Sequence, residues 1–367
     1  MKKVAIVGCG MITNSAHIPA YRHLPDNFEI VSVCDIDEKK AKETAERHGI
    51  GAYFTSFEAM LEKMKPELVS VCVPNMLHGQ YVKAALESGA DVLCEKPLSM
   101  SYKEAKELYA LAKRKGRMLC ACQSMRFTDD RLKAKELITK GELGEIYYGE
   151  FSRIRTRGIP MWGAFHIEKL SGGGAFIDIG VHMLDALMWL MDNPKVISVS
   201  GTKSAYLAHG GYRSAGDKAS GALSGNTFSE KIYSEEEFDV EDFASGSILL
   251  EGGKRINFKT AWALNLPDET SITLVGDKSS VKLPELMIFD GANTEKRDAD
   301  RYKNPYPNES FFGHFRLFDR LADYYMGKGD IPIKPEETLG VTAIIDLFYR
   351  SAKESREVKM EELEESL

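Results

Sequence analysis

Short apolar runs alternate with helical patterns along the first third of the chain. The apolar runs have the length and continuity of strands buried on both faces, and they lie at 4–7, 30–34, 68–73, 91–94 and 118–121. Between them, apolar positions recur with helical spacing at 38–48, 56–64, 78–88 and 102–115. Repeated strand–helix units of this kind predict a doubly wound parallel sheet with right-handed crossovers.

A different pattern begins after residue 123. A helix is predicted at 129–140, and the segments that follow alternate apolar and polar residues with a period of two: 147–156, 196–204, 243–250, 255–262, 271–275 and 279–283. One face of the fourth segment is formed by Ile256, Phe258, Thr260 and Trp262. With hairpin turns at 251–254 and 275–278, these segments predict a mostly antiparallel open sheet. We expect helices at 311–326 and 336–352 to cover one of its faces, and a long loop at 208–240.

The composition limits the class of protein. The 367 residues are 43% hydrophobic and 28% charged, which is typical of a soluble globular protein, and the length suggests two domains. A net charge of -7 argues against a nucleic-acid binder. No apolar run reaches the roughly 20 residues of a membrane helix, and no export signal precedes the first strand. We therefore expect a cytoplasmic protein with six reduced cysteines that serve a structural role.

A glycine-rich turn follows the first predicted strand. In Gly8-Cys9-Gly10-Met11-Ile12-Thr13, the two glycines allow a pyrophosphate to approach a helix N-terminus, although Thr13 replaces the third glycine of the usual pattern. Asp35 ends the second strand, where a carboxylate accepts hydrogen bonds from ribose hydroxyls and repels a 2′-phosphate. The sequence thus predicts a dinucleotide site and favours NAD over NADP, although Lys39 and Lys40 lie close enough in sequence to leave NADP open.

A second turn that could contact the cofactor follows the predicted strand at 68–73. Pro74 restricts the backbone there, and Asn75 offers a donor and an acceptor to a ribose or an amide. His78 either contacts the cofactor or caps the next helix.

Three side chains are candidates for acid–base chemistry. Lys96 follows a strand end, between Glu95 and Pro97, where the nicotinamide end of a cofactor is expected. Asp178 and His182 are four residues apart, so they are neighbours if one helix covers both. Oxidising an alcohol needs a hydride acceptor, which is the cofactor, and a group that removes the hydroxyl proton. His182 is the preferred base and Lys96 its electrostatic partner, although the reverse assignment stays open. The alternatives to these catalytic roles are structural: an ion pair of Glu95 at the strand end, and a buried His–Asp pair that caps a helix.

Several further features concern the surroundings of these side chains. Gly172-Gly173-Gly174 is expected to turn tightly against substrate or cofactor, and the Lys96–Pro97 bond to be cis. Asp185 is expected to be structural. Side chains considered for substrate contact are Gln123, Arg126, Arg153, Trp162 and His166. Arg153, Arg155 and Arg157 would share one strand face, which suits an acidic sugar, a solvated surface or an oligomer contact. A metal site at Asp178 and His182 is not expected, because no Cys or further His lies nearby in sequence and lysine would repel a cation.

The ordered motifs resemble one family, the Gfo/Idh/MocA oxidoreductases (glucose–fructose oxidoreductase and inositol 2-dehydrogenase). The resemblance rests on Gly8-Cys9-Gly10, on residues 74–78, on Glu95-Lys96-Pro97-Leu98, and on residues 172–185, 240–244 and 262–263. It implies an NAD(P)-binding Rossmann domain at 1–123 and, at 124–367, a domain for substrate binding and oligomerisation. It further implies that Lys96, Asp178 and His182 are catalytic, and that the cofactor is bound by Gly8, Gly10, Met11, Ile12, Asp35, Pro74, Asn75, His78, Glu95 and Lys96.

The expected function is hydride transfer between nicotinamide and a secondary hydroxyl of a sugar, polyol or sugar derivative. Because Lys96 and the pair Asp178 and His182 come from different predicted domains, we expect a cleft between domains. A homodimer or homotetramer is expected, since an open sheet tends to be covered by a partner. Two alternatives remain: a glycoside hydrolase that oxidises its substrate transiently with bound NAD, and a non-catalytic NAD sensor.

Overall fold

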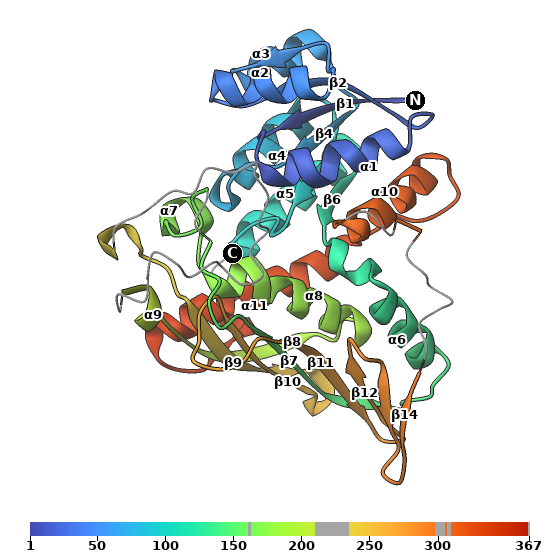
Figure 1. Cartoon of the computed structure of the whole chain (residues 1–367), viewed down its shortest axis with the longest axis vertical. Helices are drawn as coiled ribbons and strands as arrows, with labels where there is room; N and C mark the ends of the chain where they lie inside the picture. The colour runs from blue at the N-terminus through green and yellow to red at the C-terminus, as the bar shows by residue number, and fades with distance from the viewer. Residues whose placement is uncertain (161–162, 210–234, 298–304, 307–309, 366–367) are drawn as a thin grey trace. The chain divides into compact units, whose positions relative to one another are not determined.

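The computed structural model describes residues 1–160, 163–209, 235–297, 305–306 and 310–365 (Figure 1). It contains two compact units. The first unit comprises Met1–Phe127 and Tyr306–Leu339, and the second comprises Thr128–Pro305 and Gly340–Leu367. The segment from Tyr306 to Leu339 therefore belongs with the N-terminal part of the chain, which a single division into 1–123 and 124–367 does not capture.

The first unit is built on a parallel sheet of six strands. Their order across the sheet is β3-β2-β1-β4-β5-β6, which is that of a dinucleotide-binding fold and confirms the predicted Rossmann sheet. The strands are β1 (Lys2–Val7), β2 (Phe28–Cys34), β3 (Tyr53–Phe54), β4 (Leu68–Val71), β5 (Asp91–Glu95) and β6 (Leu119–Cys122). The short edge strand β3 is an addition to the prediction. Two residues are too few to produce a recognisable apolar pattern.

Helices cover both faces of this sheet. On one side a continuous core joins alternate strand residues to α3 (Phe57–Met64), α4 (His78–Glu87) and α5 (Tyr102–Lys115). On the other side lie α1 (Ile18–His23) and α10 (Phe312–Tyr325), where the rings of Tyr21 and Phe318 pack with their centroids 4.5 Å apart. The expectation that the helix at 311–326 covers the second sheet is therefore wrong. Its aromatic face completes the covering of the first sheet beside α1.

The second unit is built on a mixed sheet of nine strands in the order β14-β13-β12-β11-β7-β10-β9-β8-β15. Neighbours are antiparallel except for β7 and β10, which run parallel, so the predicted sheet is confirmed as mostly antiparallel. Its strands are β7 (Ile146–Ile154), β8 (Val196–Ser204), β9 (Phe243–Leu250), β10 (Arg255–Ala261), β11 (Glu269–Gly276), β12 (Ser280–Leu283), β13 (Met287–Phe289), β14 (Thr294–Lys296) and β15 (Val358–Lys359). Both predicted hairpins are present, between β9 and β10 and between β11 and β12.

The covered face of the second sheet packs against α8 (Val181–Leu190) and α11 (Pro335–Glu354) (Figure 1). Phe176, Phe258 and Phe348 form the centre of this core, with ring centroids of Phe176 4.9 Å from Phe258 and 4.3 Å from Phe348. The predicted inward face of β10 is confirmed, since Ile256, Phe258, Thr260 and Trp262 are all buried. The helix α6 (Asp129–Thr139) also forms where it was predicted.

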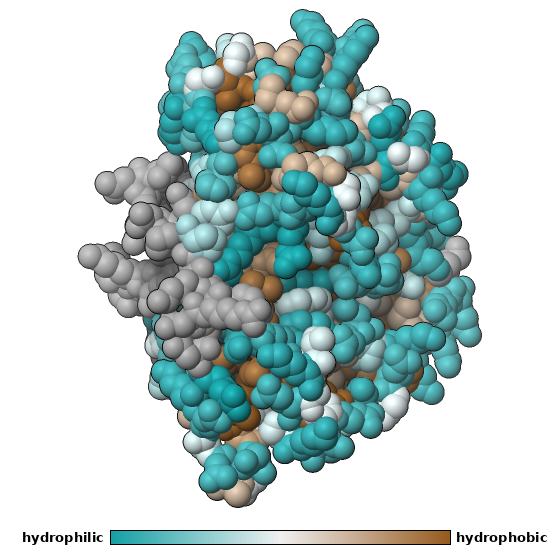
Figure 2. All heavy atoms as spheres, turned by 90° about the vertical axis from the view of Figure 1, so that its right-hand side faces the viewer, coloured by the Kyte–Doolittle hydropathy of each residue, from teal (hydrophilic) through white to brown (hydrophobic). Residues whose placement is uncertain are grey.

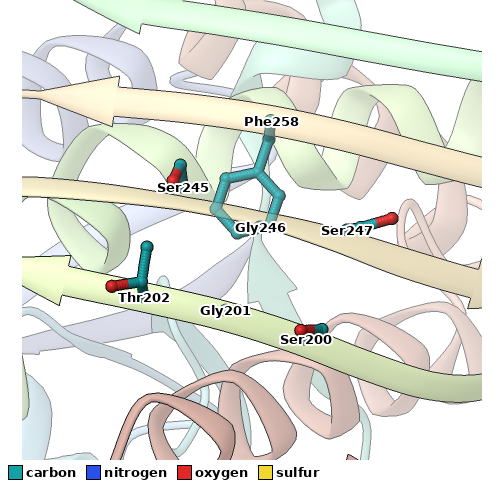
Figure 3. Close-up of a pocket in the computed structure, with 7 residues that line it drawn as sticks. All are labelled: Ser200, Gly201, Thr202, Ser245, Gly246, Ser247 and Phe258. Carbon is teal, nitrogen blue, oxygen red and sulfur yellow. The ribbon is translucent and has the colours of Figure 1, made fainter. Parts of the chain in front are cut away.

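The other face of this sheet carries small polar side chains. A hollow of about 390 Å³ lies across β8, β9 and β10, and Figure 3 shows the residues around it. It is lined by Ser200, Gly201, Thr202, Ser245, Gly246, Ser247 and Phe258. None of these residues titrates near neutral pH, so the hollow lacks the groups that acid–base chemistry needs.

One stretch of helix, Glu168–Leu190, is long and apolar enough to cross a membrane on length and composition alone. However, 83% of its apolar window is buried inside the protein, as expected of a core helix. On the face of the molecule in Figure 2, hydrophobic residues lie in small separate areas among hydrophilic ones.

Candidate active site

The glycine turn after β1 needs its first glycine. Gly8 has φ +89°, and a Cβ there would overlap the backbone carbonyl of Cys72, at the end of β4. Thr13 occupies the third position of the pattern without disturbing the turn, because it is buried and its hydroxyl donates to the Gly8 carbonyl oxygen. A Cβ at Gly10 would meet nothing within 4 Å. The turn thus presents open space at Gly10, beside the start of a helix at Met11 and Ile12.

The carboxylate of Asp35 lies against this turn. Its Oδ2 accepts a hydrogen bond from the backbone N–H of Cys9 at 2.8 Å, and its Oδ1 accepts one from Asp37 at 2.9 Å. The second strand therefore delivers a fixed carboxylate to the glycine turn, as the spacing predicted. Lys39 and Lys40 each lie near an acid of their own helix, with N–O distances of 3.9 Å to Glu43 and 3.7 Å to Asp37.

These features fit a dinucleotide. Open space at the second glycine leaves room for a pyrophosphate beside backbone N–H groups at a helix start, and a carboxylate at the end of β2 suits ribose hydroxyls. When bound, a nicotinamide dinucleotide supplies the hydride acceptor or donor. The residues that would hold it in this unit are Gly8, Gly10, Met11, Ile12 and Asp35.

The turn after β4 contains the next predicted contacts. Pro74 is exposed and Asn75 half-buried, at the start of a 3₁₀ turn, η2 (Asn75–Leu77). His78 is fully buried, with Nδ1 2.6 Å from the Pro97 carbonyl oxygen and Nε2 2.9 Å from the Val73 carbonyl oxygen. Its imidazole therefore links the chain after β4 to the chain after β5. The side chain does not cap α4, and these contacts favour a role in holding the two turns.

Glu95, the last residue of β5, has a buried carboxylate surrounded by donors. Its Oε1 lies 2.9 Å from His17 Nε2 and 3.2 Å from His314 Nε2, and its Oε2 accepts from the backbone N–H of Lys96 at 3.2 Å. Burial alone would raise the pKa of Glu95, but the hydrogen bonds from both histidines hold it well below its usual value. The carboxylate is therefore ionised.

Lys96 is half-buried directly after this carboxylate, and the Lys96–Pro97 peptide bond is cis, as predicted.

Gln123 and Arg126 are both buried, and the Arg126 guanidinium contacts the Glu337 carboxylate and the Gln123 side-chain oxygen. These contacts argue for a structural role of Gln123 and Arg126 within the first unit. Substrate contact by Gln123 stays a prediction.

In the second unit, the candidate acid and base lie on a helical run that is otherwise buried. From Gly173 to Met188 every residue is buried except Asp178 and His182, which are half-exposed. The run begins with a π-helical turn, η4 (Phe176–Gly180), continues as α8, and brings the two side chains to one accessible side. Asp178 Oδ2 accepts a hydrogen bond from Trp262 Nε1 at 2.9 Å, which fixes the carboxylate. Asp185 is buried beside Arg131, in keeping with a structural role.

Two glycines of the triplet pack against the protein itself, which differs from the expected turn against substrate or cofactor. A Cβ at Gly173 would overlap the Tyr349 hydroxyl, and one at Gly174 would overlap the Glu241 carbonyl. Glu241 is buried, and its Oε1 accepts from the Phe176 N–H and from the Tyr349 hydroxyl. The glycines thus allow the start of the buried helical run to sit on Glu241.

The prediction that Arg153, Arg155 and Arg157 share one strand face is wrong. β7 ends at Ile154, so only Arg153 belongs to it, while Arg157 bridges to Ala263 beyond the strand. Arg153 follows Gly149 and Phe151 in alternation, and a Cβ at Gly149 would touch Leu187 of α8, so this face is the helix-covered one. Burial lowers the pKa of Arg153, as do Arg155 and Arg131, while Asp178 and Asp268 oppose the shift. Arg153 is therefore in the electrostatic neighbourhood of Asp178.

Of the two remaining substrate candidates, Trp162 and His166, the structure describes only His166. Trp162 and most of the predicted loop at 208–240 lie outside the described residues. His166 is buried, and its carbonyl accepts from the Asp239 N–H.

All six cysteines are buried free thiols, and burial raises the pKa of Cys9 and Cys34 to about 12, which fits the predicted structural role.

Several residues of these networks were not anticipated: His17, His314, Glu241 as a helix cap, and Trp262 as the partner of Asp178. Glu241 and Trp262 lie in the motifs at 240–244 and 262–263, so the sequence marked their positions but did not indicate their partners. His314 is 219 residues from Glu95, and no local pattern connects the two.

Comparison with known proteins identifies the family. Residues 2–122 match "Oxidoreductase family, NAD-binding Rossmann fold" and residues 135–360 match "Oxidoreductase family, C-terminal alpha/beta domain". The D-glucoside 3-dehydrogenase of Escherichia coli (strain K12) is 31% identical over 98% of this chain and 97% of its own. A putative UDP-kanosamine synthase oxidoreductase subunit of Amycolatopsis mediterranei is 26% identical over 96% of this chain and 97% of its own.

Solved structures show the same fold. A levoglucosan dehydrogenase complex with NADH superposes with a TM-score of 0.77 at 19% identity, covering 98% of this chain and 99% of its own. The WlbA dehydrogenase from Bordetella pertussis, in complex with NADH and UDP-GlcNAcA, has a TM-score of 0.77 at 21% identity, covering 98% and 97%.

The protein is thus a nicotinamide-dependent oxidoreductase. It belongs to the Gfo/Idh/MocA family, whose two domain descriptions together cover most of the chain.

The open space at Gly10 can be tested directly. Gly10→Ala should leave the thermal stability of the cofactor-free protein unchanged, because the new methyl group meets nothing. The affinity for NAD should fall at least tenfold, because the methyl group occupies space that a pyrophosphate needs. Calorimetric titration with NAD measures the affinity. The matched change Gly51→Ala, also in open space, should affect neither quantity, and unchanged NAD affinity in Gly10→Ala would disprove this placement of the pyrophosphate.

Proposed function

We propose that the protein is an NAD-dependent dehydrogenase that oxidises the C3 hydroxyl of a D-glucoside. The observation that carries this proposal is the 31% identity to a D-glucoside 3-dehydrogenase over 98% of this chain. The relatives with a sugar in their names or titles, including the levoglucosan dehydrogenase, give the same substrate class. Two accessible polar side chains on an otherwise buried helix supply a place for acid–base chemistry.

The chain's own residues must remove the hydroxyl proton and stabilise the oxygen. His182 accepts the proton, because an imidazole exchanges protons near neutral pH. Lys96 stabilises negative charge that develops on the substrate oxygen. Asp178, held by the indole N–H of Trp262, binds a neighbouring hydroxyl or orients the imidazole. Arg153 beside Asp178 offers further donors to sugar oxygens.

The proposed cofactor is NAD, not NADP. The Asp35 carboxylate is fixed by two backbone N–H groups at the glycine turn, where it would repel a 2′-phosphate. Lys39 and Lys40 lie near acidic side chains of their own helix, which reduces their value as phosphate ligands.

We also propose that the protein is cytoplasmic and forms a homodimer or homotetramer through the second sheet. Six buried free thiols support a reducing compartment. The sheet face of Ser200, Thr202, Ser245 and Ser247 (Figure 3) carries small side chains around a hollow, which leaves room for side chains of a second copy.

The substrate proposal predicts which alcohols reduce NAD. Methyl β-D-glucopyranoside should give stoichiometric NADH and a 3-oxo product, while methyl 3-deoxy-β-D-glucopyranoside should give none. NADH absorbance and NMR of the product are the measurements. Oxidation of the 3-deoxy compound at a similar rate would contradict C3 as the reacting carbon. Glycoside cleavage without net NADH would instead favour the hydrolase alternative.

The catalytic roles predict a separation of turnover from binding. His182→Ala and Lys96→Ala should each lower kcat by about 10²–10⁴-fold with the NAD dissociation constant changed less than threefold. Steady-state kinetics and NAD titration measure the two effects. His23→Ala and Lys83→Ala, at exposed positions of α1 and α4, are controls that should retain full turnover. Normal turnover in both active-site variants would refute the mechanism.

The role of Asp35 predicts cofactor choice. Asp35→Ser should weaken NAD binding about tenfold and raise the relative affinity for NADP, because the variant loses the ribose acceptor and the charge that repels phosphate. Glu62→Ser, at an exposed position of α3, is the control and should leave the cofactor preference unchanged. Competitive titration with both cofactors measures the relative affinity for NAD and NADP. Tighter binding of NADP than of NAD by the unmodified protein would contradict the proposed NAD preference.

A further inference from the structure

The ionised carboxylate of Glu95 is buried. Among the described residues, its basic side-chain contacts are two histidines, His17 and His314. Such a group is stable in the interior only when donors replace its water. Burial lowers the pKa of His17, so this residue is neutral and uses its Nε2–H as the donor. Burial raises the pKa of Cys122 well above its usual value, and the nearby Glu95 adds to the shift, so Cys122 remains a thiol.

Besides the Cys122 thiol of β6, the donors come from three separate parts of the first unit. His17 lies in the π-helical turn η1 (Thr13–His17) after the glycine turn, His314 in α10, and the Lys96 N–H directly after β5. The rings of His17 and His314 also contact each other, with centroids 5.8 Å apart. α10 approaches closely enough that a Cβ at Gly313 would lie 2.6 Å from the Ser124 carbonyl oxygen.

As a result the main chain around Lys96 is held on both sides. Before it, the Glu95 carboxylate accepts the Lys96 N–H while two imidazoles hold its other oxygen. After it, the Pro97 carbonyl accepts from His78. The Lys96 backbone is thereby fixed by interactions that its own side chain does not make.

A metal ion is the main alternative for this cluster. Ligand atoms of His17, Glu95, Cys122 and His314 lie within 4.8 Å of one another. The N–O distances of 2.9 and 3.2 Å are compatible with hydrogen bonds. One observation favours hydrogen bonding over a metal. Among the described residues, His17 Nδ1 has no hydrogen-bond partner, whereas a metal-bound histidine normally donates its second N–H.

We propose that His17, Glu95 and His314 are positioning residues that hold Lys96 in its catalytic orientation. The inference rests on the proposed role of Lys96. His17 and His314 act only through the Glu95 carboxylate, which in turn holds the Lys96 N–H. Losing one donor loosens the carboxylate and misdirects Lys96, and small displacements of a catalytic group lower the rate substantially.

His314 offers a matched pair of variants. His314→Leu fills similar space without a donor, whereas His314→Gln places an amide N–H near the position of Nε2. His314→Leu should lower kcat at least tenfold with NAD affinity changed less than threefold, and His314→Gln should recover most of the loss. Equal losses in both variants, or a loss confined to thermal stability, would show that His314 is merely structural. His23→Leu, at an exposed position, is the control.

A double-mutant cycle links the effect to Lys96. In the Lys96→Ala background, His314→Leu should cost less than twofold in the single-turnover rate of NADH formation with methyl β-D-glucopyranoside, because no side chain remains to be positioned. A full additional tenfold loss would overturn the inference and leave the role of Lys96 intact. An unimpaired Lys96→Ala protein would overturn the proposed function itself.

Two further measurements complete the test. If His314→Leu does not fold, Glu95→Gln replaces it, because its amide has the same shape but lacks one acceptor; the same non-additivity with Lys96→Ala is expected. Metal analysis of the purified protein should find no stoichiometric ion. One equivalent of zinc whose removal abolishes activity would contradict the positioning role and establish the metal site.

Discussion

The burial of the Glu95 carboxylate is the constraint on which the first unit depends. A carboxylate at the end of an interior strand destabilises the fold by several kcal/mol unless donors surround it, and its own strand supplies only the Lys96 N–H. Further donors are the Cys122 thiol of β6, His17 in the turn after the glycine turn, and His314 of α10, which is 219 residues further along the chain. Tyr306–Leu339 belongs to the N-terminal unit, where α10 both supplies His314 to this carboxylate and covers the sheet beside α1.

A comparable constraint shapes the second unit. Its central helical run is buried on nearly all sides, so a polar side chain there must have a specific reason for its position. Glu241 holds the start of the run, and the glycines before it allow the close approach. Asp178 and His182 are the half-exposed positions that remain between Gly173 and Met188. A rigid, buried helix with two accessible polar side chains is well suited to hold catalytic groups in place.

Local patterns predicted much of this architecture. Periodicity and turn chemistry, which are properties of neighbouring residues, were sufficient for several elements. They predicted the buried strands, the helix ending at Gly116, the inward face of β10 and both hairpins. The spacing from Gly8 to Asp35 was sufficient to predict their contact. Family resemblance selected Lys96, Asp178 and His182, whose roles remain predictions.

What could not be predicted depends on partners distant in sequence. The helix at 311–326 has an apolar face, but nothing in its own residues specifies which sheet it covers. The glycine triplet signals a close approach without naming Tyr349 and Glu241 as the groups approached. His314 has no local feature that distinguishes a donor to Glu95 from any other helical histidine.

The central claim is that the protein transfers a hydride from C3 of a glucoside to NAD. Methyl β-D-glucopyranoside carrying deuterium only at C3 tests it most directly, with mass spectrometry of the NADH formed. The account predicts one deuterium in each NADH from the C3-labelled compound and none from compounds labelled at C2 or C4. Unlabelled NADH from the C3-labelled substrate would contradict it.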